Sequence, residues 1–403
     1  MRALVPARLG ADFAKLWTAS AVSNLGDGIT MVAGPLLIAS VTTDPALVGG
    51  AVFVQQLPWL LFALISGAYV DRLDRRMLVV VVNVLRAAAL AALSVAVATD
   101  TATVGVIYAV LFLLGTGETV ADTAAGAFLP AIVAPERLAV ANARLMATFT
   151  VANQFVAKPL GAWLFVIAAA VPFGVDALTF AVAAALVATI RPIPAPPAPP
   201  RRGLRVEIAE GVRWLWRHRL LRTLAVSMGA ANLAFCAAFA TLVLYARHRL
   251  GLSDVGFGFL LTTFAVGGLL GTVLAARLQR VFGAGALLRA GLVVEVVTHT
   301  VLAITTTPFV AAGVLIVFGT HTMVWGVLVV TLRQRVVPRH LLGRVGGVYA
   351  LIDVGSAALG SLVGGVLAGA WGLTTPFWIA AAAMTVVVGA AWRPLRQASA
   401  AVR

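Results

Sequence analysis

Long apolar runs alternate with short polar segments along the whole chain. The runs lie at roughly 13–38, 46–70, 77–98, 103–129, 139–169, 171–190, 221–246, 254–276, 285–305, 308–331, 344–370 and 373–392. Most of these runs reach the ~20 residues that an α-helix needs to cross a bilayer. Small residues recur within them, which favours close helix packing over a β-barrel. The pattern predicts an all-α integral membrane protein with twelve transmembrane helices.

Composition strengthens this prediction. Hydrophobic residues make up 61% of the chain and charged residues 11%, against about 45–50% and about 25% in soluble domains. The single cysteine, Cys236, excludes an intramolecular disulfide and a cysteine-based metal site. We expect no cofactor and no metal centre. The first apolar run is too long for a signal-peptide core, so we expect it to be retained as a span.

The placement of the basic residues predicts the orientation in the membrane. Of the 30 lysines and arginines, 26 fall on one side when the loops are counted alternately. The positive-inside rule then places both termini and the middle loop in the cytoplasm, in a multi-pass protein of the inner (plasma) membrane. Since topology explains the net charge of +15, we do not expect nucleic acid as a partner.

A polar connector divides the chain into two parts. Residues 191–200 contain six prolines and are expected to be extended, whereas apolar residues of 204–217 share one face of a predicted surface helix. We therefore expect a six-helix bundle at 1–190, a linker at 191–220 and a second bundle at 221–403. A regulatory role for the surface helix is an alternative that nothing in the sequence supports.

The two bundles also look like repeats. The segment Val133–Leu138 before the fifth run resembles Val336–Leu341 before the eleventh, at an offset of 203 residues. The same offset carries Gly161 onto Gly364. Two six-helix pseudo-repeats are the simplest interpretation, and in such transporters the substrate site lies near the midplane.

The loop between the second and third runs carries a specific motif. Its residues, Gly67, Asp71, Arg72, Arg75 and Arg76, resemble the cytoplasmic signature of the major facilitator superfamily, with Asp74 where a second glycine is usual. Segments at 23–28, 135–142, 210–216 and 333–345 resemble its bacterial drug, macrolide and siderophore (enterobactin exporter-like) efflux branch. The resemblance implies a rocker-switch fold with a cavity lined by spans 1, 4, 7 and 10, and proton-driven export.

Charged residues inside the spans indicate function, because each costs free energy in the bilayer unless it has a partner or a water-filled cavity. Asp27 shares one face of the first run with Asn24 and Met31, and a carboxylate there can bind a proton or a cationic solute. Hydrogen bonding between helices is the structural alternative. We predict Asp27 as a coupling residue, and Asn24 and Met31 as cavity residues.

Three further charges lie on the third and fourth runs. Glu118 and Asp122 are one helical turn apart, and Arg86 reaches a depth comparable to that of Glu118. We expect a Glu118 pair with Arg86, either permanent or broken by protonation, and assign both to proton coupling. Asp122 is nearer the cytoplasm, where Arg72 or Arg76 can reach it, and is assigned to the gating motif.

The remaining intramembrane candidates divide into two groups. Lys158 has no obvious acidic neighbour, so it either binds an anionic part of the solute or pairs with a carboxylate of another span. Glu295 and His299 are interpreted as a structural pair on the ninth run. The cavity candidates of the second half are Asn232, Phe235, His321 and Trp325, which suit a bulky, partly apolar solute.

These features predict a proton-coupled exporter of amphipathic small molecules that acts as a monomer among membrane lipids. No phosphate-binding loop of the type Gly-x-x-x-x-Gly-Lys-Ser/Thr occurs, so the driving force is expected to be an ion gradient. An uptake carrier or lysolipid flippase of the same fold is the first alternative. A non-transporting scaffold or an intramembrane enzyme is a second, although the sequence lacks a His-Glu-x-x-His pair and a Gly-x-Ser-x-Gly elbow.

Overall fold

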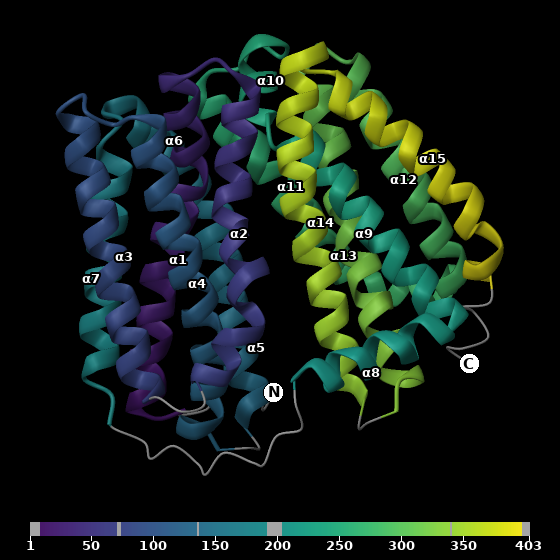
Figure 1. The fold of residues 1–403 in the computed structure, drawn as a ribbon, viewed down its shortest axis with the longest axis horizontal. Coiled ribbons are helices and arrows are strands. Elements are labelled where there is room, and N and C mark those ends of the chain that lie inside the picture. Colours follow the sequence, from purple (N-terminus) through teal and green to yellow (C-terminus); the bar gives the residue numbers. More distant parts are fainter. Residues whose placement is uncertain (1–8, 71–73, 135–136, 192–203, 339–340, 397–403) are drawn as a thin grey trace, which may run out of the picture. The chain divides into compact units, whose positions relative to one another are not determined.

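A computed structural model describes residues 9–70, 74–134, 137–191, 204–338 and 341–396. Every regular element in this part of the chain is a helix (Figure 1). The chain forms two compact units, one from Met1–Val41 with Val54–Pro199 and the other from Thr42–Phe53 with Pro200–Arg403. Helix α2 (Pro45–Val70) contributes residues to both.

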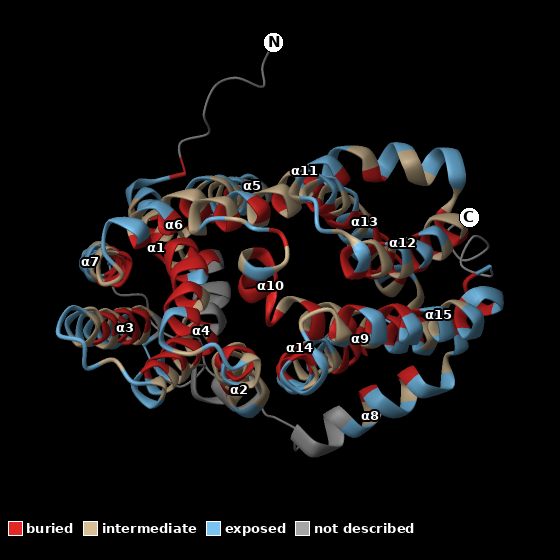
Figure 2. Ribbon diagram, turned by 90° about the horizontal axis from the view of Figure 1, so that it is seen from above, coloured by how far each residue is buried: buried red, intermediate tan, exposed pale blue. Residues whose placement is uncertain are grey.

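The first unit is built around its amino-terminal helix. Helix α1 packs against α7, α6 and η2, while α3 packs against both α4 and α7. Much of α1 is buried, as Figure 2 shows, and the side chains of Ile29, Val32 and Leu36 are fully enclosed. The elements besides α2 are α1 (Ala11–Val41), α3 (Arg75–Ala98), α4 (Val104–Ile132), α5 (Leu138–Phe149), η2 (Thr150–Val156), α6 (Ala157–Ile167) and α7 (Val171–Ala188).

The second unit pairs its long helices in the same manner. Helix α11 packs against α13, α9 packs against α14 and α15, and α12 packs against α13 and α15. Its elements are α8 (Leu204–Arg217), α9 (Arg219–Phe239), α10 (Leu242–His248), α11 (Asp254–Phe282), α12 (Ala284–Ile304), α13 (Pro308–Val336), α14 (Leu342–Trp371) and α15 (Thr375–Arg396).

The helices agree closely with the predicted apolar runs. Within the described residues, 11 helices are long and apolar enough to cross a membrane. The fifth predicted run corresponds to α5, η2 and α6, which follow one another without a break but include a π-helical turn. The all-α membrane fold is confirmed, and the number twelve stays a prediction.

The seventh run is shorter as a helix than predicted. The run 221–246 was expected to be continuous, but α9 ends at Phe239 and α10 begins at Leu242 after a non-helical Thr241. The short α10 is held in the second unit by Tyr245, whose hydroxyl donates to the Leu302 carbonyl oxygen at 2.7 Å. The helix of the seventh run is therefore broken at Thr241. The break does not expose α10, because residues 242–246 are all buried.

The predicted repeat is visible in the packing of the two units. Gly161 of α6 lies against the backbone of Ile29 in α1, and Gly364 of α14 lies against the backbone of Ala237 in α9. A side chain at either glycine would overlap the facing backbone, so both positions require a small residue. The two glycines related by the 203-residue offset thus perform the same packing role.

The predicted surface helix is present as α8. Its Leu215 is fully buried in the core of the second unit, and an ion pair between Glu210 and Arg344 ties it to α14. Val212, expected on the same apolar face, is 37% exposed. Large apolar side chains on other helices are also exposed, among them Val273 at 71% and Leu85 at 64%, as expected for surfaces that contact lipid.

Candidate functional site

The first unit encloses an ion pair between two spans. The Arg86 guanidinium Nη2 on α3 lies 2.7 Å from Oδ1 of Asp27 on α1. The Arg86 side chain is 7% exposed and that of Asp27 is 33% exposed. The guanidinium carbon also lies 3.9 Å from the centre of the Phe180 ring on α7, within range of a cation–π interaction. Three helices therefore meet at this cation.

Asp176 of α7 is a second carboxylate beside this pair. It is 1% exposed, and it accepts hydrogen bonds from the Thr30 hydroxyl at 2.6 Å and the Thr179 hydroxyl at 3.0 Å. The sequence did not predict Asp176 as a residue of this site. Its spacing of four residues from Phe180 was the available signal, because that spacing places both on the face that meets Arg86.

Arg86 has a partner that the sequence did not predict. The sequence predicted a pair with Glu118, but the carboxylate that the structure places at hydrogen-bond distance is that of Asp27. Gly117, the neighbour of Glu118 on α4, faces the Arg86 side-chain stem, and its Cβ position would lie 2.8 Å from Cγ and Cδ. This part of α4 thus lies at the depth of the Arg86 side chain, whereas the rotation of α4 about its axis was not available from the sequence.

Lys158 is buried without a carboxylate at its amine in the described structure. It is 5% exposed, and its Nζ donates to Oε1 of Gln154 at 2.6 Å. Gln154 lies in the π-helical turn η2 and donates in turn to Asn153, which donates to the Asn24 carbonyl oxygen. The predicted cavity residue Asn24 thus belongs to this polar chain, whereas the predicted Met31 is 51% exposed on the unit surface.

The signature loop lies partly outside the described residues. Asp71 and Arg72 lie outside the described residues, as do the side chains of Arg75 and Asp122, while Gly67 lies in the last turn of α2. Asp74, which replaces the usual glycine, caps α3 by accepting from the backbone N–H of Arg76 at 2.9 Å. The Arg76 guanidinium donates to the Ile190 carbonyl oxygen at 2.6 Å, so it holds the end of α7.

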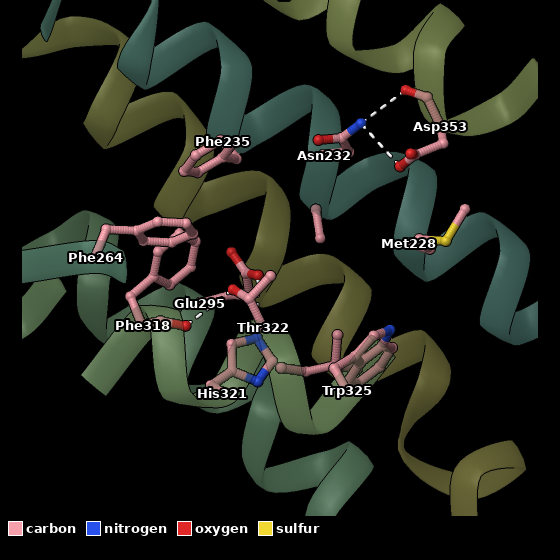
Figure 3. Close-up of a pocket in the computed structure, with 12 residues that line it drawn as sticks. Met228, Asn232, Phe235, Phe264, Glu295, Phe318, His321, Thr322, Trp325 and Asp353 are labelled. Carbon is pink, nitrogen blue, oxygen red and sulfur yellow. Dashed lines mark hydrogen bonds and ion pairs between the residues drawn. The ribbon is translucent and has the colours of Figure 1, made fainter. Parts of the chain in front are cut away.

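The second unit contains a cavity of about 150 Å³ between α9, α11, α12, α13 and α14 (Figure 3). It brings together all four cavity residues predicted for this half, namely Asn232, Phe235, His321 and Trp325. Phenylalanines that the sequence did not single out complete one wall, because nothing in the pattern of an apolar helix marks the rings that face inward. They are Phe264 and Phe318, whose ring centres lie 5.8 Å and 5.5 Å from that of Phe235.

Glu295, which the sequence analysis paired with His299, also lines this cavity. Oε1 of Glu295 lies 3.2 Å from Nε2 of His321 on α13, and Oε2 lies 3.8 Å from Nδ1 of His299. His299 is fully buried, and its Nδ1 also lies 2.8 Å from the Glu295 carbonyl oxygen. The ninth span is therefore not peripheral to the cavity of this unit.

At the opposite side of the cavity Asp353 of α14 contacts α9. The Asn232 amide donates to Oδ1 of Asp353 at 3.0 Å and to its carbonyl oxygen at 2.7 Å. The cavity thus combines an aromatic wall with two carboxyl groups, an arrangement suited to amphipathic solutes.

Comparisons with known proteins agree with this architecture. Residues 2–401 match the transmembrane secretion effector family. The chain is 27% identical over 374 residues to the multidrug efflux pump Tap of Mycolicibacterium fortuitum, covering 89% of this chain and 90% of that protein. It is also 32% identical over 151 residues to human solute carrier family 67 member A1, covering 36% of this chain and 34% of that protein.

Solved structures share the fold. The nucleoside transporter NupG superposes with a TM-score of 0.76 at 13% identity, covering 96% of this chain and all of that one. A bacterial homologue of the iron transporter ferroportin superposes with a TM-score of 0.75 at 16% identity, covering 96% of this chain and 98% of that one. The chain therefore belongs to the transmembrane secretion effector family and is a secondary transporter of the major facilitator type.

Proposed function

We propose that the protein exports amphipathic small molecules by proton-coupled alternating access. The observation that carries this proposal is the ion pair of Asp27 with Arg86, because its carboxylate belongs to a membrane span and is still one-third exposed. A carboxylate in that position can take up a proton from one side and release it to the other. The likeness to a multidrug efflux pump over 89% of the chain supports export.

The coupling step in this proposal is the loss of one ion pair. Protonation of Asp27 neutralises the partner of Arg86 and leaves the guanidinium over the Phe180 ring. Asp176 lies close enough to interact electrostatically with both Asp27 and Arg86. The cation can then turn toward Asp176 or toward Glu118 on α4, and either change alters how α1 packs against α3 and α7. Glu118 is retained in the coupling set for this reason.

The solute is proposed to bind in part through the cavity of the second unit. Its aromatic wall contacts an apolar body, and its carboxyl groups and Asn232 contact polar groups. Lys158, buried beside Gln154, is proposed to meet an anionic part of the solute. The signature residues Gly67, Asp71, Arg72, Arg75 and Arg76, with Asp122, are proposed to form the cytoplasmic gate.

Vesicles with a defined proton gradient test this proposal. Purified protein would be reconstituted in liposomes containing a pH-sensitive dye, and a panel of anionic, cationic, zwitterionic and neutral amphipathic compounds would be added. We expect at least one compound to drive proton flux in the antiport direction, and Asp27→Asn to abolish that flux. Asp100→Asn, at an exposed position in the turn after α3, is the matched control and should retain it.

The same vesicles separate export from its alternatives. Proton movement in the same direction as the solute would indicate uptake, and flux in the absence of a gradient would indicate a facilitator. Proton-coupled flux that is unchanged in Asp27→Asn would show that the assigned coupling carboxylate is wrong. Antiport, and drug resistance through it, require that the compound and the proton cross the membrane in opposite directions.

A further inference from the structure

The aromatic wall of the cavity in the second unit is a continuous surface of rings. The Phe235 ring is tilted against that of Phe239, with centres 4.1 Å apart, and stacked with that of Phe318, with centres 5.5 Å apart. The ring centre of Phe264 lies 5.9 Å from that of Phe318. Figure 3 shows the Phe235, Phe264 and Phe318 rings gathered on one side of the cavity. Aromatic faces carry partial negative charge, so they attract cations as well as apolar groups.

Beneath this wall, the Glu295 carboxyl group has one oxygen without a hydrogen bond. Glu295 is 5% exposed, and Oε1 lies 3.2 Å from Nε2 of His321, which can donate to it. Oε2 has no hydrogen-bond partner, and its nearest charged neighbour is Nδ1 of His299 at 3.8 Å. The Nδ1 hydrogen is directed to the Glu295 carbonyl oxygen at 2.8 Å, so it does not satisfy Oε2. Burying a carboxylate oxygen without a hydrogen bond costs free energy of folding, and a hydrogen-bond donor would stabilise it.

The charges around the cavity favour a cation as the hydrogen-bond donor to Glu295. Two carboxyl groups line it, from Glu295 and Asp353, and no lysine or arginine is among the lining residues in the described part of the unit. The two neighbouring imidazoles, His299 and His321, lie on the Glu295 side of the cavity. The centre of each imidazole ring is 6.0 Å from that of the Phe318 ring. A cationic group in the cavity would therefore contact the faces of the rings, and it would reach Oε2, which is itself buried, when the Glu295 side chain turns toward the cavity.

We propose that this cavity is a binding subsite for organic cations that carry one aromatic or compact apolar group. The protonated amine would donate to the Glu295 carboxylate once that side chain turns toward the cavity, and the apolar group would lie against Phe235, Phe264 and Phe318. The cavity of about 150 Å³ accommodates a single ring, since an engineered cavity of similar size binds benzene. The proposal rests on the proposed export function only for the claim that the bound cation is transported.

The position of His321 is set by a close approach of two helices. Gly291 of α12 faces His321, and a Cβ at Gly291 would lie 2.6 Å from its Cε1 and Nδ1 atoms. The absence of a side chain there allows His321 to reach Glu295. The imidazole then occupies only one carboxylate oxygen and leaves the other for the ligand.

Benzylamine and benzyl alcohol form a matched pair of probes for this subsite. They have the same ring and nearly the same size, but benzylamine is a cation at pH 7 and the alcohol is uncharged. Binding to the purified full-length protein in lipid nanodiscs would be measured by saturation-transfer difference NMR titration. We expect the dissociation constant of benzylamine to be lower than that of benzyl alcohol by about tenfold or more. Equal dissociation constants for the two probes would overturn the proposal.

Two variants test whether the preference for benzylamine over benzyl alcohol depends on Glu295. Glu295→Gln keeps the side-chain size and removes the charge, and we expect it to abolish the preference for benzylamine. Asp254→Asn removes a carboxylate that pairs with Arg247 outside the cavity and should retain the preference. A preference unchanged in Glu295→Gln would place the cation elsewhere and overturn the proposal.

A second pair of variants serves if Glu295→Gln does not fold. Thr322 lines the cavity but is exposed, so the chain can accept larger side chains there. Thr322→Lys adds a positive charge and Thr322→Met adds similar bulk without one. We expect the lysine variant alone to lose the preference for benzylamine, and equal preference in the two variants would contradict the assignment.

The binding measurement needs no gradient and therefore stands apart from export. Preferential benzylamine binding through Glu295, without proton-coupled flux in vesicles, would support the subsite and remove the export proposal. Proton-coupled flux of other compounds, without preferential benzylamine binding, would support export and remove the subsite.

Discussion

Gly26 of α1 lies directly against the Asp176 carboxyl group of α7. A Cβ at Gly26 would overlap Oδ1 of Asp176 and the hydroxyl oxygen of Thr179. The two helices can approach this closely because Gly26 has no side chain. The approach places the Thr30 hydroxyl oxygen 2.6 Å from Oδ2 of Asp176, to which it donates. The packing of one glycine therefore determines the hydrogen bonds of a buried carboxyl group.

Replacement of Gly26 by alanine should destabilise the first unit. The added methyl group forces α1 and α7 apart or displaces Asp176, and overpacking of this kind costs about 1–3 kcal/mol. Gly34→Ala on the same helix is the control, because nothing lies within 4 Å of its Cβ position. Thermal denaturation of the purified variants should show a lower midpoint for Gly26→Ala alone. Equal midpoints would mean that the close contact is not present in the membrane protein.

The Asp27 and Arg86 pair predicts a non-additive effect on stability. Asp27→Asn leaves the Arg86 charge buried and should cost on the order of 3 kcal/mol, at the low end because Asp27 is 33% exposed. Adding Arg86→Met removes the unpaired charge, so the double variant should recover much of the lost stability. Both variants should lack proton-coupled flux. Additive losses in the double-mutant cycle would argue against the pair.

Lys158 predicts a gain in stability when its charge is removed. It is 5% exposed and its described hydrogen bond is to a neutral amide, so the fold bears most of the cost of burying the amine. We expect Lys158→Met to be neutral or to raise the stability by about 1 kcal/mol. If Lys158 meets an anionic part of the solute, the same variant should lose flux of anionic and zwitterionic compounds. A variant that unfolds would indicate a structural partner.

Asp74 predicts a capping effect at α3. Its carboxylate accepts hydrogen bonds from the backbone N–H groups of Arg76 and Met77. Asp74→Ala should lower the stability by about 1 kcal/mol, and Asp74→Asn should retain most of it because asparagine caps nearly as well. Thermal denaturation of the two variants compares them directly. Equal stability of the alanine and asparagine variants would argue that the capping is not needed.

The predicted orientation can be tested by cysteine labelling. In a Cys236→Ala background, Arg217→Cys on α8 and Asp100→Cys after α3 each provide a single thiol at an exposed position. We expect a membrane-impermeant maleimide to label Asp100→Cys in intact cells and Arg217→Cys only in inverted vesicles. Labelling of Arg217→Cys from outside would reverse the proposed topology and the direction of every proton step.

The residues of the two sites were predicted unequally well. Asn232, Phe235, His321 and Trp325 were expected in one cavity, and the structure brings them together. The spacing along two helices was enough for this prediction. Asn232 and Phe235 are three residues apart and His321 and Trp325 are four apart, so each pair lies on one face of its helix. Asp176, by contrast, was not predicted as a site residue, because its contact with Thr30 joins residues 146 positions apart.

The apolar runs alone determined the all-α membrane architecture, since the thickness of the bilayer requires long helices whatever their neighbours are. They could not determine which carboxylate faces Arg86. Asp27 and Glu118 both lie at reachable depths, and the choice depends on how each helix is rotated about its axis. That rotation is set by close packing at glycines such as Gly26 and Gly117, which only the folded unit brings against their neighbours.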